Sequence, residues 1–352
     1  MATPIVHLGD FQPRSVPFAT WEKFRNRKNV HLLSECFAEA LGVFFYVYAG
    51  VGSGAGWVLG NILGEPLSSI LQIGFAYALG ILLSLSVCAG TSGGHINPCV
   101  TISLTIFRKF PRRKVIPYIV SQIFGAYVAC GLIYIQWKEL IVSAENTLTA
   151  AGTLESTLFS PTGPAGVFAF YLPAGQTFAR VFVNEWVVCM FIAWVIWASM
   201  DPANLMITPA MGPVVVSLSY SAAIWGFATT GIALNTARDL GGRLFVMSVY
   251  GVGASGGRYA AIAALTNIPA TIFAVLLYEL FLTDSDRVIP RANFEFASVL
   301  RNHRRFGHAH IREDDDATRQ VVVDGVGELH KSMSSRVRDE SSSGKEDIYA
   351  RV

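Results

Sequence analysis

Six apolar runs, each near the length of a membrane-spanning helix, constrain this 352-residue chain more than any other feature. A helix needs about 20 predominantly apolar residues to cross the hydrocarbon core of a bilayer. The runs are Ser34–Val51, Ser68–Ala89, Val115–Leu140, Phe178–Ser199, Pro209–Thr230 and Tyr259–Leu282. Charged residues make up 15% of the chain, against about a quarter in soluble domains. The sequence therefore predicts an all-α membrane protein with six transmembrane helices.

The placement of basic residues predicts the orientation in the membrane. Lys and Arg precede the first run and cluster again at Arg108–Lys114, whereas 52–67 and 141–177 contain neither. Cytoplasmic loops carry the positive excess, so both termini are expected in the cytoplasm, most simply at the plasma membrane. The N-terminus shows no basic region followed by an apolar core, so no cleaved signal peptide is expected.

The polar ends and one loop complete the expected domain organisation. Residues 1–33 form a cytoplasmic tail, and 283–352 form a second one that is expected to be disordered, because its composition buries too little apolar surface. The region between the tails is 34–282, with repeats at about 34–140 and 178–282. The segment 141–177 joins them and is expected to be an extracellular loop over the outer mouth.

A weak internal repeat relates the two halves. "FAEALGVFF" and "VNEWVVCMF" each place one glutamate, Glu39 or Glu185, in the first span of a half, and "GHINPCVT" parallels "IALNTARD" after the second span. Because each half contains three spans, the halves run in opposite directions across the membrane. This is an inverted repeat with its axis in the membrane plane, as in many transport proteins.

The repeated motif predicts two re-entrant half-helices. Asn97 is a good N-cap, and Pro98 suits the first helical position because its missing N–H has no partner there. The apolar stretch that follows is about ten residues, or about 15 Å, which is half of the bilayer core. Irregular backbone at this depth is tolerated when it is buried or lines a watery cavity, so the paired motifs indicate a pore. A single copy would fit an ordinary loop turn better than a half-helix, and the second copy at the matching place in the inverted half reverses that preference.

These motifs, together with Glu39 and Glu185, resemble those of the major intrinsic protein family, the aquaporins and aquaglyceroporins, over about Leu33–Leu282. The family signature is Asn-Pro-Ala twice, and this chain departs from it at Cys99 and Thr236. The resemblance implies a passive channel for water and small uncharged solutes such as glycerol, which excludes protons and ions. It also implies a homotetramer in the lipid bilayer, and the long tails are similar to those of fungal members.

The resemblance also assigns site residues. The pore-midpoint motifs are Asn97, Pro98, Cys99, Asn235, Thr236 and Ala237; the selectivity filter is Tyr77, Ala223, Ile232 and Arg238; the supporting residues are His95, Glu39, Glu185 and Asp239. Ala223 stands where water-selective members usually have histidine, which implies a wider, glycerol-conducting filter with the donors of Arg238 opposite an apolar wall.

Other interpretations of these residues remain. Arg238 and Asp239 could form a structural ion pair at a membrane edge, and the two glutamates could relay protons rather than accept hydrogen bonds from the loops. At the level of the whole chain, the alternatives are a secondary transporter with broken helices and a non-conducting structural protein of the same fold. No catalytic pair, phosphate-binding loop or metal-ligand cluster stands out, so neither an enzyme nor a cofactor, a metal or a nucleic-acid partner is expected.

Overall fold

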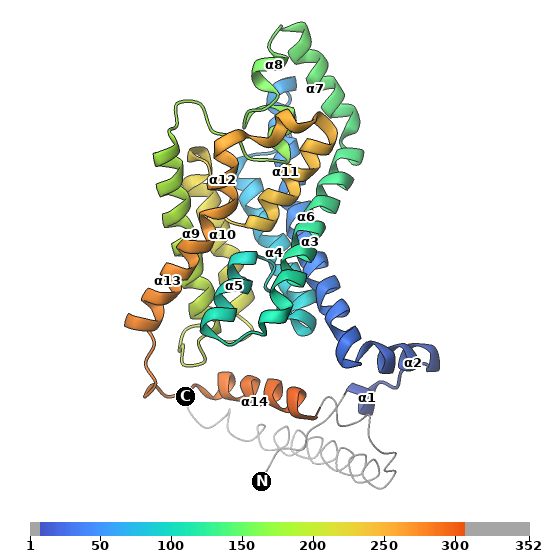
Figure 1. Ribbon diagram of the computed structural model, residues 1–352, viewed down its shortest axis with the longest axis vertical. Helices are drawn as coiled ribbons and strands as arrows, with labels where there is room; N and C mark the ends of the chain where they lie inside the picture. The colour runs from blue at the N-terminus through green and yellow to red at the C-terminus, as the bar shows by residue number, and fades with distance from the viewer. Residues whose placement is uncertain (1–7, 307–352) are drawn as a thin grey trace, which may run out of the picture. The chain divides into compact units, whose positions relative to one another are not determined.

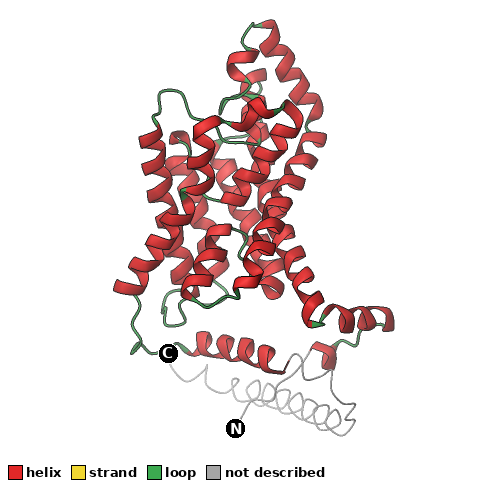
Figure 2. Cartoon of the chain, in the orientation of Figure 1, coloured by secondary structure: helices red, strands yellow, loops and turns green. Residues whose placement is uncertain are grey.

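The computed structural model describes residues 8–306, and every regular element in that range is a helix (Figures 1 and 2). The α-helices are α1 Leu8–Phe11, α2 Val16–Arg25, α3 Lys28–Leu63, α4 Ile70–Ser92, α5 Pro98–Phe107, α6 Val115–Gln136, α7 Lys138–Ala150, α8 Leu154–Thr157, α9 Phe178–Met200, α10 Gly212–Phe227, α11 Thr236–Tyr250, α12 Gly257–Leu265, α13 Asn267–Phe281 and α14 Arg291–Phe306. The 3-10 turns are η1 Arg112–Lys114, η2 Pro164–Val167, η3 Ala228–Thr230 and η4 Val252–Ser255. Residues Lys28–Ala297 form one compact unit, and helices α1 and α2 belong to a second unit.

Five helices in the described range are long and apolar enough to cross a membrane: α3, α4, α6 with η1, α9, and α12 with α13. The sixth predicted span is the shorter helix α10, whose 16 residues rise about 24 Å. The turn η3 carries the chain on to Thr230, so α10 and η3 together approach the thickness of the bilayer core. Large exposed apolar side chains on the outer faces, such as Phe37, Leu79 and Ile135, fit a lipid environment.

Helix α3 is much longer than the predicted span Ser34–Val51, because it continues through a glycine-rich stretch to Leu63. A Cβ on Gly60 would come within 2.5 Å of the Glu65 carbonyl oxygen. The glycine therefore lets the following loop fold back onto the helix. Gly64, at φ +73°, ends the helix, and Glu65 N–H donates to the Gly60 carbonyl in the pattern of a Schellman cap.

The predicted outer loop 141–177 is partly helical. Helix α6 ends at Gln136, and after Trp137 the chain continues as α7 to Ala150. Ile141 and Ala144 of α7 are fully buried, and α7 packs against α3 and η2. The apolar side of α7 explains why this part of the segment is ordered as a helix.

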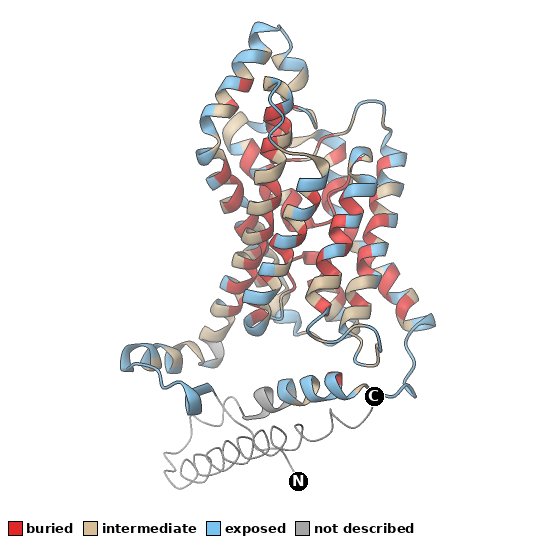
Figure 3. Ribbon diagram, turned by 180° about the vertical axis from the view of Figure 1, so that it is seen from behind, coloured by how far each residue is buried: buried red, intermediate tan, exposed pale blue. Residues whose placement is uncertain are grey.

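The packing of the helices follows an inverted repeat. Helix α3 packs against α4 and α6, as α9 packs against α10 and α13. Each half-helix packs against a spanning helix of the other half: α5 packs on α13, and α11 packs on α6. Figure 1 shows α5 and α11 in the middle of the bundle, and Figure 3 shows buried residues concentrated on the inner faces of the upright helices. The fold is six transmembrane helices with two re-entrant half-helices.

One part of the tail that was expected to be disordered is helical. Residues 291–306 form α14, and the rest of the predicted disorder beyond residue 306 lies outside the described residues. Asn293 at the start of α14 is buried, and its amide donates to the carbonyls of Pro202 at 2.9 Å and Asn204 at 3.2 Å. These contacts order the beginning of the segment. In the N-terminal tail, α2 begins with Pro17 in its first turn and is exposed on most of its surface.

Candidate pore

The N-termini of the two half-helices are joined by their capping asparagines. Asn97 and Asn235 both have extended backbone and accept from the helix with their side-chain oxygens, Asn97 from Cys99 N–H and Asn235 from Ala237 N–H. Each amide nitrogen crosses to the opposite loop: Asn97 donates to the Leu234 carbonyl at 3.0 Å, and Asn235 donates to the Ile96 carbonyl at 2.8 Å. Each amide group keeps a second N–H, which these contacts leave available.

The residue before each asparagine has a left-handed backbone. Ile96 has φ 44° and Leu234 has φ 61°, a conformation that costs a residue with a bulky side chain of order 1–3 kcal/mol. The strained conformation turns each carbonyl toward the opposite asparagine. Two buried glutamates hold these backbones: Glu39 accepts from His95 N–H and Ile96 N–H, and Glu185 accepts from Ala233 N–H and Leu234 N–H, all between 2.7 and 2.9 Å.

The first loop has a larger polar network than the second. Glu39 also accepts from the Ser92 hydroxyl at 2.6 Å and from the Gln122 amide at 2.7 Å. The ring nitrogen Nδ1 of His95 lies 3.1 Å from the Thr101 hydroxyl. His95 thus braces the loop from inside the protein. No group of three or more His, Cys, Asp or Glu between residues 8 and 306 could hold a metal ion.

Arg238, in the first turn of α11, is held from two directions. Its Nε donates to the Tyr77 hydroxyl at 3.1 Å, and its Nη1 donates to the Phe168 carbonyl at 2.7 Å. The Phe170 ring covers the guanidinium, with Cζ 3.9 Å from the ring centroid. A guanidinium has five N–H groups, and these two hydrogen bonds use two of them. The arginine therefore has a fixed position and donors to offer.

The structure brings together only part of the predicted filter. Tyr77 meets Arg238 directly. Ala223 on α10 and Ile232 in the second loop are both buried in the apolar core of the bundle, where Tyr77 packs as well. Phe168 and Phe170 are not among the residues predicted from the sequence. Phe168 acts through its backbone carbonyl, which carries no sequence signal, and Phe170 comes from a loop far from either motif.

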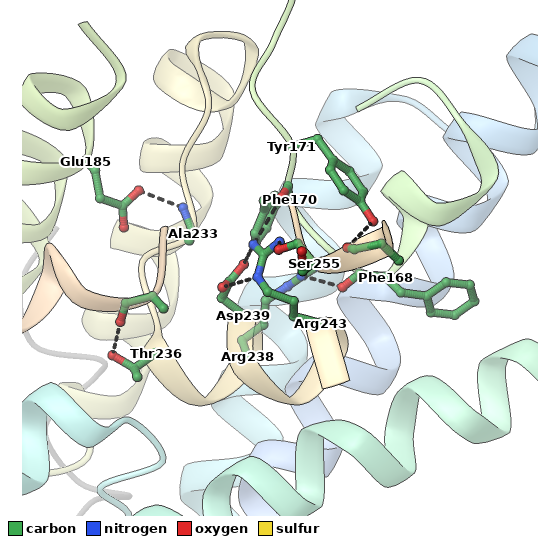
Figure 4. A network of polar contacts seen from close by, with 12 residues as sticks. Phe168, Phe170, Tyr171, Glu185, Ala233, Thr236, Arg238, Asp239, Arg243 and Ser255 are labelled. Atoms are coloured by element: carbon green, nitrogen blue, oxygen red, sulfur yellow. Dashed lines mark hydrogen bonds and ion pairs between the residues drawn. The ribbon is translucent and has the colours of Figure 1, made fainter. Parts of the chain in front are cut away.

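Asp239 pairs with Arg243, one turn along α11, and not with its neighbour Arg238 (Figure 4). Two hydrogen bonds, at 2.6 and 3.0 Å, join the buried side chains. Arg243 also donates to the carbonyls of Ser255 at 2.9 Å and Phe170 at 3.0 Å. The pair therefore fixes the loop that carries Phe170. The Asp-x-x-x-Arg spacing was the available signal for Arg243.

The remaining predicted residues lie at the half-helix tips. Pro98 is the first residue of α5, and Thr236 is the first residue of α11. Cys99 and Ala237, the next residues, are buried at 4% and 0% exposure. Helix α11 has 15 residues, so it is longer than the half-span that the sequence suggested. Its buried Arg238, Asp239 and Arg243 explain why that stretch is not apolar along its whole length.

Two capped half-helices, joined tip to tip inside an inverted repeat of spanning helices, define a class of membrane channel. The chain belongs to the major intrinsic protein family, whose model matches residues 26–255. It is 56% identical over 317 residues to Aquaporin-3 of Laccaria bicolor, which covers 90% of this chain and 96% of that protein. It is 34% identical over 219 residues to the glycerol uptake facilitator protein of Escherichia coli (strain K12), over 61% of this chain and 74% of that protein.

A solved structure agrees on the fold. The aquaglyceroporin from Plasmodium falciparum superposes with a TM-score of 0.61 at 21% identity, covering 71% of this chain and 97% of that one. The chain is thus an integral membrane protein with the aquaporin fold, and it functions as a channel.

Proposed function

We propose that the channel conducts water and small uncharged solutes such as glycerol, and excludes protons and other ions. The observation that carries the proposal is the reciprocal pair of asparagine bonds, which fixes the N-termini of α5 and α11 at one point. Each N-terminus carries about half a positive charge, so their meeting point repels cations. The remaining N–H groups of Asn97 and Asn235 donate to a passing hydroxyl oxygen. The names of the relatives, an aquaporin and a glycerol facilitator, support the same solutes.

The solute range follows from the residues around Arg238. Its free N–H groups form a donor face for hydroxyls. Ala223, Ile232 and the ring of Tyr77, whose hydroxyl contacts Arg238, form the apolar wall on which the carbon backbone of a polyol lies. Because Ala223 is small, the filter admits glycerol as well as water. Phe170 belongs to this proposal too, since its ring covers the guanidinium.

The setting in the cell completes the proposal. Both termini are cytoplasmic, as the basic residues at 108–114 indicate, and the plasma membrane is the location. The channel domain is 34–282 between two cytoplasmic tails, and the functional assembly is a homotetramer, by analogy with the family.

The test is stopped-flow light scattering on liposomes that contain the purified protein, under a sucrose gradient and then a glycerol gradient. Fast shrinkage in sucrose and fast re-swelling in glycerol are expected, and an internal pH dye should report no added proton leak. Dependence of the flux on an ion gradient would favour a coupled transporter, and folded protein without either flux would favour a structural role.

Two tryptophan variants on α10 make the test specific to the filter. Ala223 is fully buried, whereas its neighbour Ala222 is exposed on the outer face. Ala223→Trp should abolish both fluxes, because an indole fills the proposed filter. Ala222→Trp should leave both unchanged, because its indole faces lipid. Equal fluxes in the two variants would contradict the placement of the filter.

A further inference from the structure

Thr236, where the family signature has proline, makes a polar contact that proline could not make. Its hydroxyl lies 2.7 Å from the Ala264 carbonyl and 2.7 Å from the side-chain oxygen of Asn267 (Figure 4 shows Thr236 with one of its partners). Thr236 is 4% exposed, and Asn267 is not exposed at all. Buried polar groups cost free energy unless they are hydrogen-bonded, so the direction of each hydrogen bond in this contact matters.

The Thr236 hydroxyl has a consistent set of partners when the Asn267 amide is turned over. One hydroxyl hydrogen cannot serve both oxygens, and the Nδ2 of Asn267 has no partner in the orientation with Oδ1 toward Thr236. The two ends of an amide are assigned from the hydrogen-bond network. With Nδ2 toward Thr236, the amide donates to the hydroxyl and the hydroxyl donates to the Ala264 carbonyl. These two hydrogen bonds pair the Thr236 hydroxyl and one N–H of the Asn267 amide.

The hydrogen bonds from Asn267 through Thr236 end at the Ala264 carbonyl, beside a break in the last span. Pro269 has no N–H, so it cannot bond the Leu265 carbonyl, and α12 ends at Leu265 while α13 begins at Asn267. Thr236 is the first residue of α11. The hydroxyl thus links the tip of the second half-helix to the break in the last span. The first half has Pro98 at the matching position, with no hydroxyl, so the link is particular to the second tip.

We propose that Thr236 and Asn267 are positioning residues that fix the tip of α11, and with it the Asn235 amide, in the pore. This rests on the proposed function. Asn235 directly precedes Thr236, and its bond to the Ile96 carbonyl at 2.8 Å aligns the two tips. Proline stiffens such a position through its ring; here a hydrogen-bonded hydroxyl does so. Glycerol must meet several donors in line, whereas water reorients freely, so a displaced tip slows glycerol more than water.

The experiment compares Thr236→Val, Asn267→Leu, their double variant and Thr236→Ser in liposomes, with permeability divided by the number of folded channels. Thr236→Val leaves the Asn267 amide buried without a partner, so glycerol permeability should fall roughly fivefold or more, and water permeability less. The activation energy for glycerol should rise. The double variant removes both polar groups and should recover much of the loss, and Thr236→Ser, which keeps the hydroxyl, should rescue conduction. Thr147→Val on α7 is the matched control, since that hydroxyl is exposed and bonds only the Ser143 carbonyl of its own helix.

Three results would overturn the proposal. Unchanged glycerol flux in Thr236→Val would show that the hydroxyl positions nothing. An equal loss of water and glycerol flux with constant activation energies would show a purely structural role. If the double variant loses as much glycerol permeability as the two single variants lose together, the residues do not act together. If the parent protein conducts neither solute, the proposed function fails instead. The pairing of Thr236 and Asn267 is then tested by thermal unfolding, by comparing the stability loss of the double variant with the losses of the two single variants.

Discussion

A single methyl group at the crossing of α3 and α6 should separate these helices. Gly125 of α6 lies so close to α3 that a Cβ there would be 2.1 Å from the Ala40 carbonyl oxygen. Ordinary contact begins near 3.4 Å, so Gly125→Ala requires the backbones to move apart by about 1.3 Å. Small residues at such crossings are what let membrane helices approach closely.

The cost of that movement can be worked from the neighbouring contacts. Overpacking a tight site costs about 1–3 kcal/mol. Gln122, one turn before Gly125, donates to Glu39, the residue next to Ala40, at 2.7 Å. A shift of about 1.3 Å would stretch this bond past hydrogen-bonding distance, and a bond to a charged group is worth about 1.5–3 kcal/mol. Together the loss is about 2.5–6 kcal/mol.

The assay is thermal unfolding of the purified protein, followed by flux measurements on whatever remains folded. A loss of about 3 kcal/mol should lower Tm by roughly 6 °C or more. Gly131→Ala is the matched control, on the same helix with the same substitution, because its Cβ would meet only the Phe245 ring at 3.7 Å. That variant should be neutral or up to about 1 kcal/mol more stable. Equal Tm values for the two variants would refute the close approach of α6 to α3.

Three further substitutions, with one control, test the buried network and the filter. Arg243→Met leaves the carboxylate of Asp239 buried without its ion-pair partner, which should cost about 3–5 kcal/mol in unfolding measurements, whereas Arg291→Ala breaks an exposed pair and should leave the stability nearly unchanged. Glu185→Gln turns an amide N–H toward one of two backbone N–H donors, which should cost about 2–4 kcal/mol, and wild-type stability of this variant would contradict those bonds. Phe170→Leu removes the ring that covers the filter arginine, so the ratio of glycerol to water permeability should change about twofold or more while the protein stays folded; an unchanged ratio would exclude the ring from the filter.

Local chemistry made much of the architecture predictable. Asn97 and Asn235 combine helix-capping side chains with a repeated position, so the half-helices and their meeting could be read from the sequence before any contact was known. The starts of α5 and α11, at Pro98 and Thr236, lie where the capping argument placed them. The buried glutamates gave the same kind of signal, because a carboxylate inside a membrane helix needs donors.

Contacts across the chain could not be predicted in this way. Asn267 is 31 residues from Thr236, and no spacing pattern links them. Phe168 reaches Arg238 through a carbonyl that any residue would supply. The end of α3 was misplaced because glycines such as Gly60 usually weaken a helix, whereas here they admit a close backbone. These features depend on tertiary proximity rather than on residue type.

The crossed asparagine bonds also set the order in which the molecule can be completed during synthesis. Asn97 and its acceptor Leu234 are 137 residues apart, whereas Glu39 and the Ile96 amide that it holds are 57 apart. At about 5–20 residues per second, the ribosome needs roughly 7–30 s to add the second tip after the first. During that interval Glu39 can already hold the first loop, but the carbonyl of Ile96 still awaits Asn235. The midpoint of the pore can therefore close only after the second motif has been made, and a chain that stops between the two motifs has half a loop network and no closed midpoint.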